Sequence, residues 1–319
     1  MSILLQQLVS DVSRDVQEQV KNAVRDHRDK VREAVSAHTR MFLRRYYGDM
    51  FDTGRYDTIT INVAVRPGLP APLLPSEKQQ ISEQHRLAIV LSPFRRDLLG
   101  LRDHGKVVAT EVVNHLRSWP EAQPLLADKD QALEAAWRYA EMLLLKLEQF
   151  RLTQFILRID QDVLGIYDYS GADPKIEMYW GVLGLVARDL DVSVEDLTCV
   201  VLAHEYAHAF THVGTDANDA SWETSRFAGA AYEVKEGLAQ YFTELTCRQI
   251  KVRGAYAAYE KLVEQQPPAY RVHLEWKVKP EIVRLAMMKM RRIQGGDLSL
   301  ALFSRLLTEA AEQLGAGRA

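Results

Sequence analysis

The chain of 319 residues is long enough for one large domain or two small ones, and its 47% hydrophobic and 26% charged residues are typical of a folded protein in water. Lys and Arg total 40 against 43 Asp and Glu, so the chain lacks the excess of basic residues that is typical of nucleic-acid-binding proteins. Only Cys199 and Cys247 carry thiols, which argues against a disulfide-stapled secreted scaffold. We see no signal peptide and no apolar run long enough for a membrane span, and therefore expect a cytoplasmic protein.

The first element that the sequence predicts is a long helix over residues 3–45. Leucine and valine recur there at steps of three and four, with charged residues between them and no Gly or Pro. The apolar stripe is narrow, so it either packs on the body of its own chain or pairs with a second chain as a homodimer.

Strands and further helices follow this helix. Residues 58–65, TITINVAV, alternate with period two and predict a strand, and the proline-rich stretch 67–75 predicts a loop. Residues 85–94 are a second candidate strand, and helical patterns cover about 105–118 and 129–150.

A β-rich stretch precedes the most informative part of the chain. Residues 155–180 read FILRI, then GIYDY, a turn at SGADP and then KIEMYW, and a helix is expected over 181–190. Ser193 and Asp196 then resemble a capping box in which Asp replaces Glu, placed just before an apolar run. We therefore expect a new helix to begin near Ser193.

That helix carries the motif HEYAH, with His204, Glu205 and His208. Residues four apart share one face of an α-helix, so both imidazoles can reach one ion. Glu205 is rotated by about 100° from His204 and lies beside the ion, where it can act on the water at the open position. Two imidazoles and one carboxylate suit a single zinc ion with one position left for water. The alternative without a metal site is a helix whose two histidines have hydrogen-bond partners and whose glutamate lies at the surface.

The third metal ligand is expected downstream. The metzincin pattern fails because Thr211 and Gly214 stand where a glycine and a third histidine are required. His212 lies one turn beyond His208, and a straight helix carries it away from the ion, so it is expected near the ligands or at the surface.

A second helix, beginning near Ala230, reads AAYEVKEGLAQYFTELTCRQI. Its segment EGLAQY, together with HEYAH, resembles the active-site segments of gluzincin metallopeptidases of the aminopeptidase-N-like and thermolysin-like kinds. The resemblance covers about 45 residues, from Leu202 to Leu245, and implies that Glu236 is the third ligand. Glu236 lies 28 residues after His208 (236 − 208), a longer spacing than in the best-known gluzincins. Glu233, one turn earlier on the same face, is the rival ligand.

The resemblance further implies hydrolysis of peptide bonds in a peptide or protein substrate, with Glu205 as general base and then general acid. An oxyanion donor is also expected, and we favour Tyr270 because the prolines before it suggest a chain segment that returns to the site. The other candidates for this role are Tyr256, Tyr259 and His273. The resemblance also implies an edge strand that pairs with the substrate backbone. Residues 175–180 are placed to form that strand, and the alternative is an ordinary internal strand.

These elements predict a mostly helical α+β fold with a small sheet, the metal helix and a C-terminal helical lobe. We expect three parts: an N-terminal helix over 1–50, an α+β part with the edge strand and the HExxH helix over 51–213, and a helical lobe with the third ligand over 214–319. The functional alternative to a zinc peptidase is a catalytically inactive or regulatory zinc-binding scaffold or sensor. The sequence leaves open the substrate, and whether cleavage is internal or terminal.

Overall fold

The computed structural model describes residue 12, a few isolated positions between 114 and 143, and four continuous ranges: 14–47, 55–70, 163–171 and 173–315. The continuous ranges belong to one compact unit, formed by Val9–Leu74 and Ile156–Ala319. The strand expected over 85–94 lies outside the described residues, and so do nearly all of the helices expected over 105–118 and 129–150.

The compact unit is mostly helical and contains two small sheets, which confirms the predicted α+β class. Its helices are α2 (Arg14–Thr39), α9 (Trp180–Leu190), α10 (Val194–His212), α11 (Thr224–Gly229), α12 (Tyr232–Gln249), α13 (Ala255–Gln265), α14 (Pro268–Arg271), the 3₁₀ helix η4 (Val272–Glu275), α15 (Pro280–Arg292) and α16 (Leu300–Gln313). Its strands are β1 (Arg44–Tyr47), β2 (Arg55–Thr58), β3 (Asn62–Arg66), β4 (Gly165–Asp168) and β5 (Lys175–Tyr179). Among the described residues, no helix is both long and apolar enough to cross a membrane.

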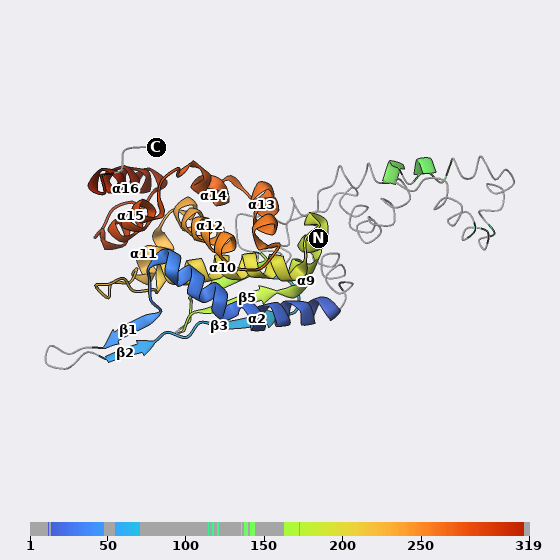
Figure 1. Cartoon of the computed structure of the whole chain (residues 1–319), viewed down its shortest axis with the longest axis horizontal. Helices are drawn as coiled ribbons and strands as arrows, with labels where there is room; N and C mark the ends of the chain where they lie inside the picture. The colour runs from blue at the N-terminus through green and yellow to red at the C-terminus, as the bar shows by residue number, and fades with distance from the viewer. Residues whose placement is uncertain are drawn as a thin grey trace, which may run out of the picture. The chain divides into compact units, whose positions relative to one another are not determined.

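Helix α10 lies at the centre of this unit and is surrounded by other elements (Figure 1). It begins where predicted, because the Ser193 hydroxyl accepts the backbone N–H of Asp196 at 2.9 Å. Every residue from Leu197 to His212 is buried, so the helix has no solvent face. Each polar side chain of a helix enclosed in this way needs a partner within the protein, because an unpaired buried polar group costs free energy.

Helix α2 covers one side of α10. Its valine stripe, including Val20, Val24, Val31 and Val35, is buried in contact with α10 and α12 of the same chain. A homodimer through this helix stays a prediction, and the stripe that suggested it packs internally here. The helix is shorter than expected: Arg40 adopts a positive φ of 58° directly after its end, and the expected last turn is part of strand β1.

The three-stranded sheet has the order β3-β5-β4, so β5 is the central strand and not an edge strand. Strand β3 pairs with β5 in parallel and β4 pairs with it antiparallel. The prediction that residues 175–180 form an edge is therefore wrong, because a strand from more than a hundred residues earlier covers that side. The single strand expected over 58–65 is two strands, since β2 ends at Thr58 and β3 begins at Asn62.

Residues 213–223, which connect α10 with α11, are fastened at several points. Thr215 forms an isolated antiparallel bridge with Phe42, and the Asp216 carboxylate lies 2.7 Å from the guanidinium of Arg292. The buried Arg291 donates to the carbonyl oxygen of Ala220 at 2.9 Å. Part of the chain between α10 and α12 is thus a loop held against α15 and the segment just before β1.

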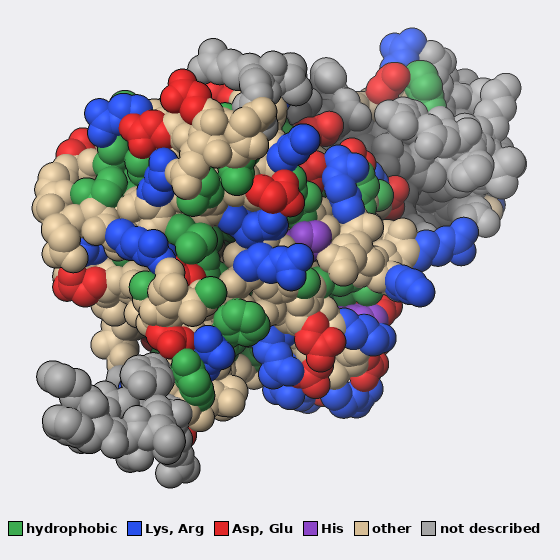
Figure 2. Space-filling model, turned by 60° about the vertical axis from the view of Figure 1, so that its left-hand side comes forward, with side chains coloured by type: hydrophobic (Ala, Val, Ile, Leu, Met, Phe, Trp, Pro, Cys, Tyr) green, Lys and Arg blue, Asp and Glu red, His purple; other side chains and the backbone are tan. Residues whose placement is uncertain are grey.

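The surface of the molecule mixes both signs of charge. On the face that Figure 2 shows, Lys and Arg side chains are interspersed with Asp and Glu. The C-terminal helices α15 and α16 are separated at Gly295 and Gly296, whose φ angles of 84° and 85° favour glycine.

Candidate metal centre

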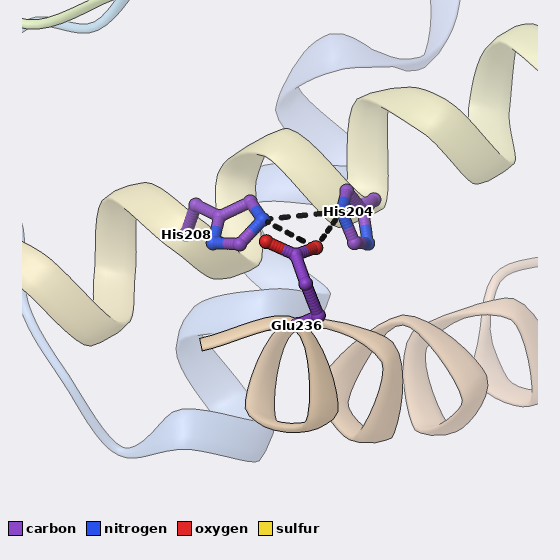
Figure 3. Close-up of side chains that lie close together, drawn as sticks. All are labelled: His204, His208 and Glu236. Carbon is purple, nitrogen blue, oxygen red and sulfur yellow. Dashed lines mark hydrogen bonds and ion pairs between the residues drawn. The ribbon is translucent and has the colours of Figure 1, made fainter. Parts of the chain in front are cut away.

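Two helices bring three side chains to one point. His204 and His208 lie one turn apart on α10, and Glu236 extends towards both from the first turns of α12 (Figure 3). The two histidine Nε2 atoms are 3.1 Å apart. The Oε2 atom of Glu236 lies 3.3 Å from Nε2 of His204 and 3.4 Å from Nε2 of His208. The three donor atoms therefore form a nearly equilateral triangle.

This triangle fits a tetrahedral metal ion. Donors held at about 2.0–2.1 Å from an ion in a tetrahedral site lie about 3.3–3.4 Å from one another. The observed spacings of 3.1, 3.3 and 3.4 Å match one face of such a tetrahedron, with its fourth corner left for water or substrate. All three side chains are buried, with exposed fractions of 6%, 4% and 3%. Two imidazole nitrogens and one carboxylate oxygen form a donor set that zinc and other divalent transition metals accept.

The structure separates the two rival glutamates. Glu236 is buried in the cluster, whereas Glu233 is exposed and lies outside the group that can hold a metal. The neighbouring Gly237 explains part of this placement. A Cβ atom at Gly237 would lie 2.6 Å from Val272 and 2.8 Å from Trp276, so the bare glycine allows the η4 segment to pack closely on α12. The close neighbour of Gly237 is thus the segment after Tyr270.

Glu205 is buried on the same helix, with 1% of its surface exposed. It lies on the side of α10 that faces the sheet, where strand β4 passes close to its side chain at Gly165. Its carboxylate is therefore held inside the protein, one residue after the first histidine of the cluster, rather than on a solvent-facing surface. The alternative of a surface glutamate does not hold for this residue.

Tyr270 lies next to the cluster. Its ring stacks on that of His204, with centroids 5.8 Å apart and an interplanar angle of 26°. Its hydroxyl accepts a hydrogen bond of 2.7 Å from the hydroxyl of Tyr232. Sequence reasoning missed Tyr232. Its position four residues before Glu236 places both on one face of α12, which is the signal that could have identified it.

The other three candidates for the oxyanion donor have different partners. The Tyr259 hydroxyl lies 2.6 Å from Nε2 of the buried His273, within hydrogen-bond distance. Tyr256 is bonded and stacked to Arg248 at the half-buried end of α13. Burial lowers the pKa of His273 to about 4 despite the nearby carboxylate of Glu244, so the ring is neutral near pH 7.

His212 is buried one turn beyond His208 and is not part of the cluster. Its Nδ1 atom lies 3.1 Å from the Tyr167 hydroxyl and its Nε2 atom 3.1 Å from that of Thr224. The ring stacks on Phe227 with centroids 4.4 Å apart. Burial lowers the pKa of His212 to about 4. His212 is thus a neutral packing residue that ties α10 to β4 and α11, and it is not at the surface.

Comparisons with models of protein families, with curated proteins and with solved structures found no match. The resemblance to gluzincins therefore rests on the segment from Leu202 to Leu245 alone.

Proposed function

We propose that the protein is a zinc-dependent peptidase that holds one zinc ion through His204, His208 and Glu236. The observation that carries this proposal is the triangle of three buried donor atoms at tetrahedral spacings, next to the buried carboxylate of Glu205. A structural zinc site is usually closed by four protein ligands, and only three protein donors converge among the described residues. An open fourth position favours catalysis over a purely structural role.

In the proposed reaction, a water molecule attacks the carbonyl carbon of a peptide bond. Bound zinc would supply a Lewis acid that lowers the pKa of water towards 7 and polarises the carbonyl group. Glu205 accepts the proton of the attacking water and then donates it to the leaving amine nitrogen as the C–N bond breaks. The Tyr270 hydroxyl, which Tyr232 holds in place, donates to the oxyanion. An extended substrate would pair with the outer edge of β4, which no other described strand occupies.

The test compares wild type with Glu205→Gln in zinc content and in cleavage of a broad peptide library. Glutamine keeps the shape of the side chain but cannot accept the proton. We expect one zinc per chain in both proteins and a kcat about 10²–10⁴-fold lower in the variant. Zinc binding without cleavage in either protein would contradict the peptidase and favour the regulatory scaffold or sensor.

A further inference from the structure

Strand β4 contacts the metal helix at a residue without a side chain. Gly165, the first residue of β4, faces α10 at the level of Glu205. A Cβ atom at this position would lie 2.7 Å from Oε1 and 2.9 Å from Cγ of Glu205, and 2.8 Å from a methyl group of Val201. All three distances are shorter than real Cβ contacts allow. The glycine therefore occupies a close contact between the sheet backbone and the proposed general base.

The backbone conformation at position 165 does not require a glycine. Gly165 lies in a regular strand and its φ is not in the positive region that side chains avoid. Glycine inside a strand weakens the strand, since it loses much conformational freedom on folding and has no side chain to pack. Gly165 is also opposite Met178 of the central strand, where a larger residue would normally add to the core. The close approach of the Glu205 side chain, together with that of a Val201 methyl group, is the feature that requires a bare Cα atom.

The strand itself cannot easily move away from Glu205. Its ladder with β5 pairs all four residues of β4, and the backbone N–H of Tyr179 donates to the carbonyl oxygen of Leu164 at 3.0 Å just before it. Two residues further along, the Tyr167 hydroxyl bonds to His212, which lies on the same helix as Glu205. The strand is thus fixed to α10 on the far side of the contact. A side chain added at position 165 would be accommodated mainly by displacement of the Glu205 carboxylate.

We propose that Gly165 is a positioning residue for Glu205: the bare strand backbone at this point leaves the space in which the Glu205 carboxylate lies, and so sets where the proposed general base is held. The close contact between position 165 and Glu205 does not depend on the proposed function. Only its catalytic consequence rests on the proposed peptidase activity.

The catalytic consequence is tested with Gly165→Ala in the zinc-loaded full-length chain. Alanine adds one methyl group without disturbing His204, His208 or Glu236, so zinc content should remain at one ion per chain. Displacement of a reacting group by about 1 Å can lower a rate about 100-fold, and we expect kcat to fall by about that factor with KM nearly unchanged. The matched control is Gly229→Ala, where a Cβ atom would meet nothing within 4 Å and both constants should stay as in wild type. Equal kcat values for wild type and Gly165→Ala would overturn the proposal.

A second measurement needs no enzymatic activity. The denaturation midpoint is compared for wild type, Gly165→Ala, Glu205→Ala and the double variant, all without metal. If the Glu205 side chain occupies the space at position 165, the added methyl group lowers the midpoint clearly in wild type and by less when residue 205 is alanine, where the close Val201 contact remains. An equal decrease in both backgrounds would overturn the contact. A chain that cleaves no peptide but shows the unequal decrease would contradict the peptidase and leave the contact standing.

Discussion

Two kinds of buried histidine occur in the compact unit, and they differ in what their ring nitrogens face. His204 and His208 direct Nε2 towards each other and towards the carboxylate of Glu236. His212 and His273 instead have a tyrosine hydroxyl within hydrogen-bond distance of one ring nitrogen. A histidine nitrogen that faces a neutral hydroxyl has a partner without an ion, whereas two nitrogens and a carboxylate oxygen facing one point form a group that could hold a cation.

The same contrast holds for two of the buried tyrosines beside these histidines, Tyr270 and Tyr259. Removal of the Tyr270 hydroxyl should remove the oxyanion donor, and we expect Tyr270→Phe to lower kcat about 100-fold without loss of zinc. Tyr259→Phe only deprives His273 of its partner, so it should leave kcat unchanged and lower the free energy of unfolding by about 1–2 kcal/mol. Steady-state kinetics and chemical denaturation of both variants make the comparison. Equal decreases in kcat would show that the two tyrosines do not have separate roles.

A pH series distinguishes the packing histidines from solvent-exposed ones. The pKa of His273 is lowered by burial from 6.5 to about 4, so on acidification the unfolded chain binds this proton first. The stability that the neutral ring contributes is present above pH 6.5 and is lost as the pH falls towards 4. Between these limits, wild type should lose about 3 kcal/mol more stability than His273→Gln. Parallel stability curves for the two metal-free proteins would show that His273 is not held neutral by burial.

Local spacing was sufficient to predict the part of the site that one helix carries. His204, Glu205 and His208 follow from helix geometry, and the Ser193 cap fixed where that helix begins. The placement of Glu236 required a relation between two helices, which the sequence indicated only through a family resemblance. The distinction from Glu233 became visible when the structure buried one residue and exposed the other.

The features that the sequence did not reveal depend on contacts between distant segments. The central position of β5 depends on β3, which lies more than a hundred residues earlier. The contact of Gly165 with Glu205 and the bond between Tyr232 and Tyr270 each join residues that are 38 or more positions apart in the sequence. Periodicity and spacing report on one element at a time, so they carry no information on which strand or loop covers a given helix face.

The most direct test of the metal centre is a zinc titration of wild type, Glu236→Ala and Glu233→Ala against a chromogenic chelator. If His204, His208 and Glu236 bind the ion together, wild type binds one zinc per chain and Glu236→Ala binds it at least about 100-fold more weakly, since loss of a direct ligand exceeds the 10–100-fold effect of losing a residue that only supports one. Glu233→Ala, the matched control one turn away, should keep the affinity of wild type. A Glu236→Ala protein with wild-type zinc affinity, or a wild type that binds no zinc, would contradict the account.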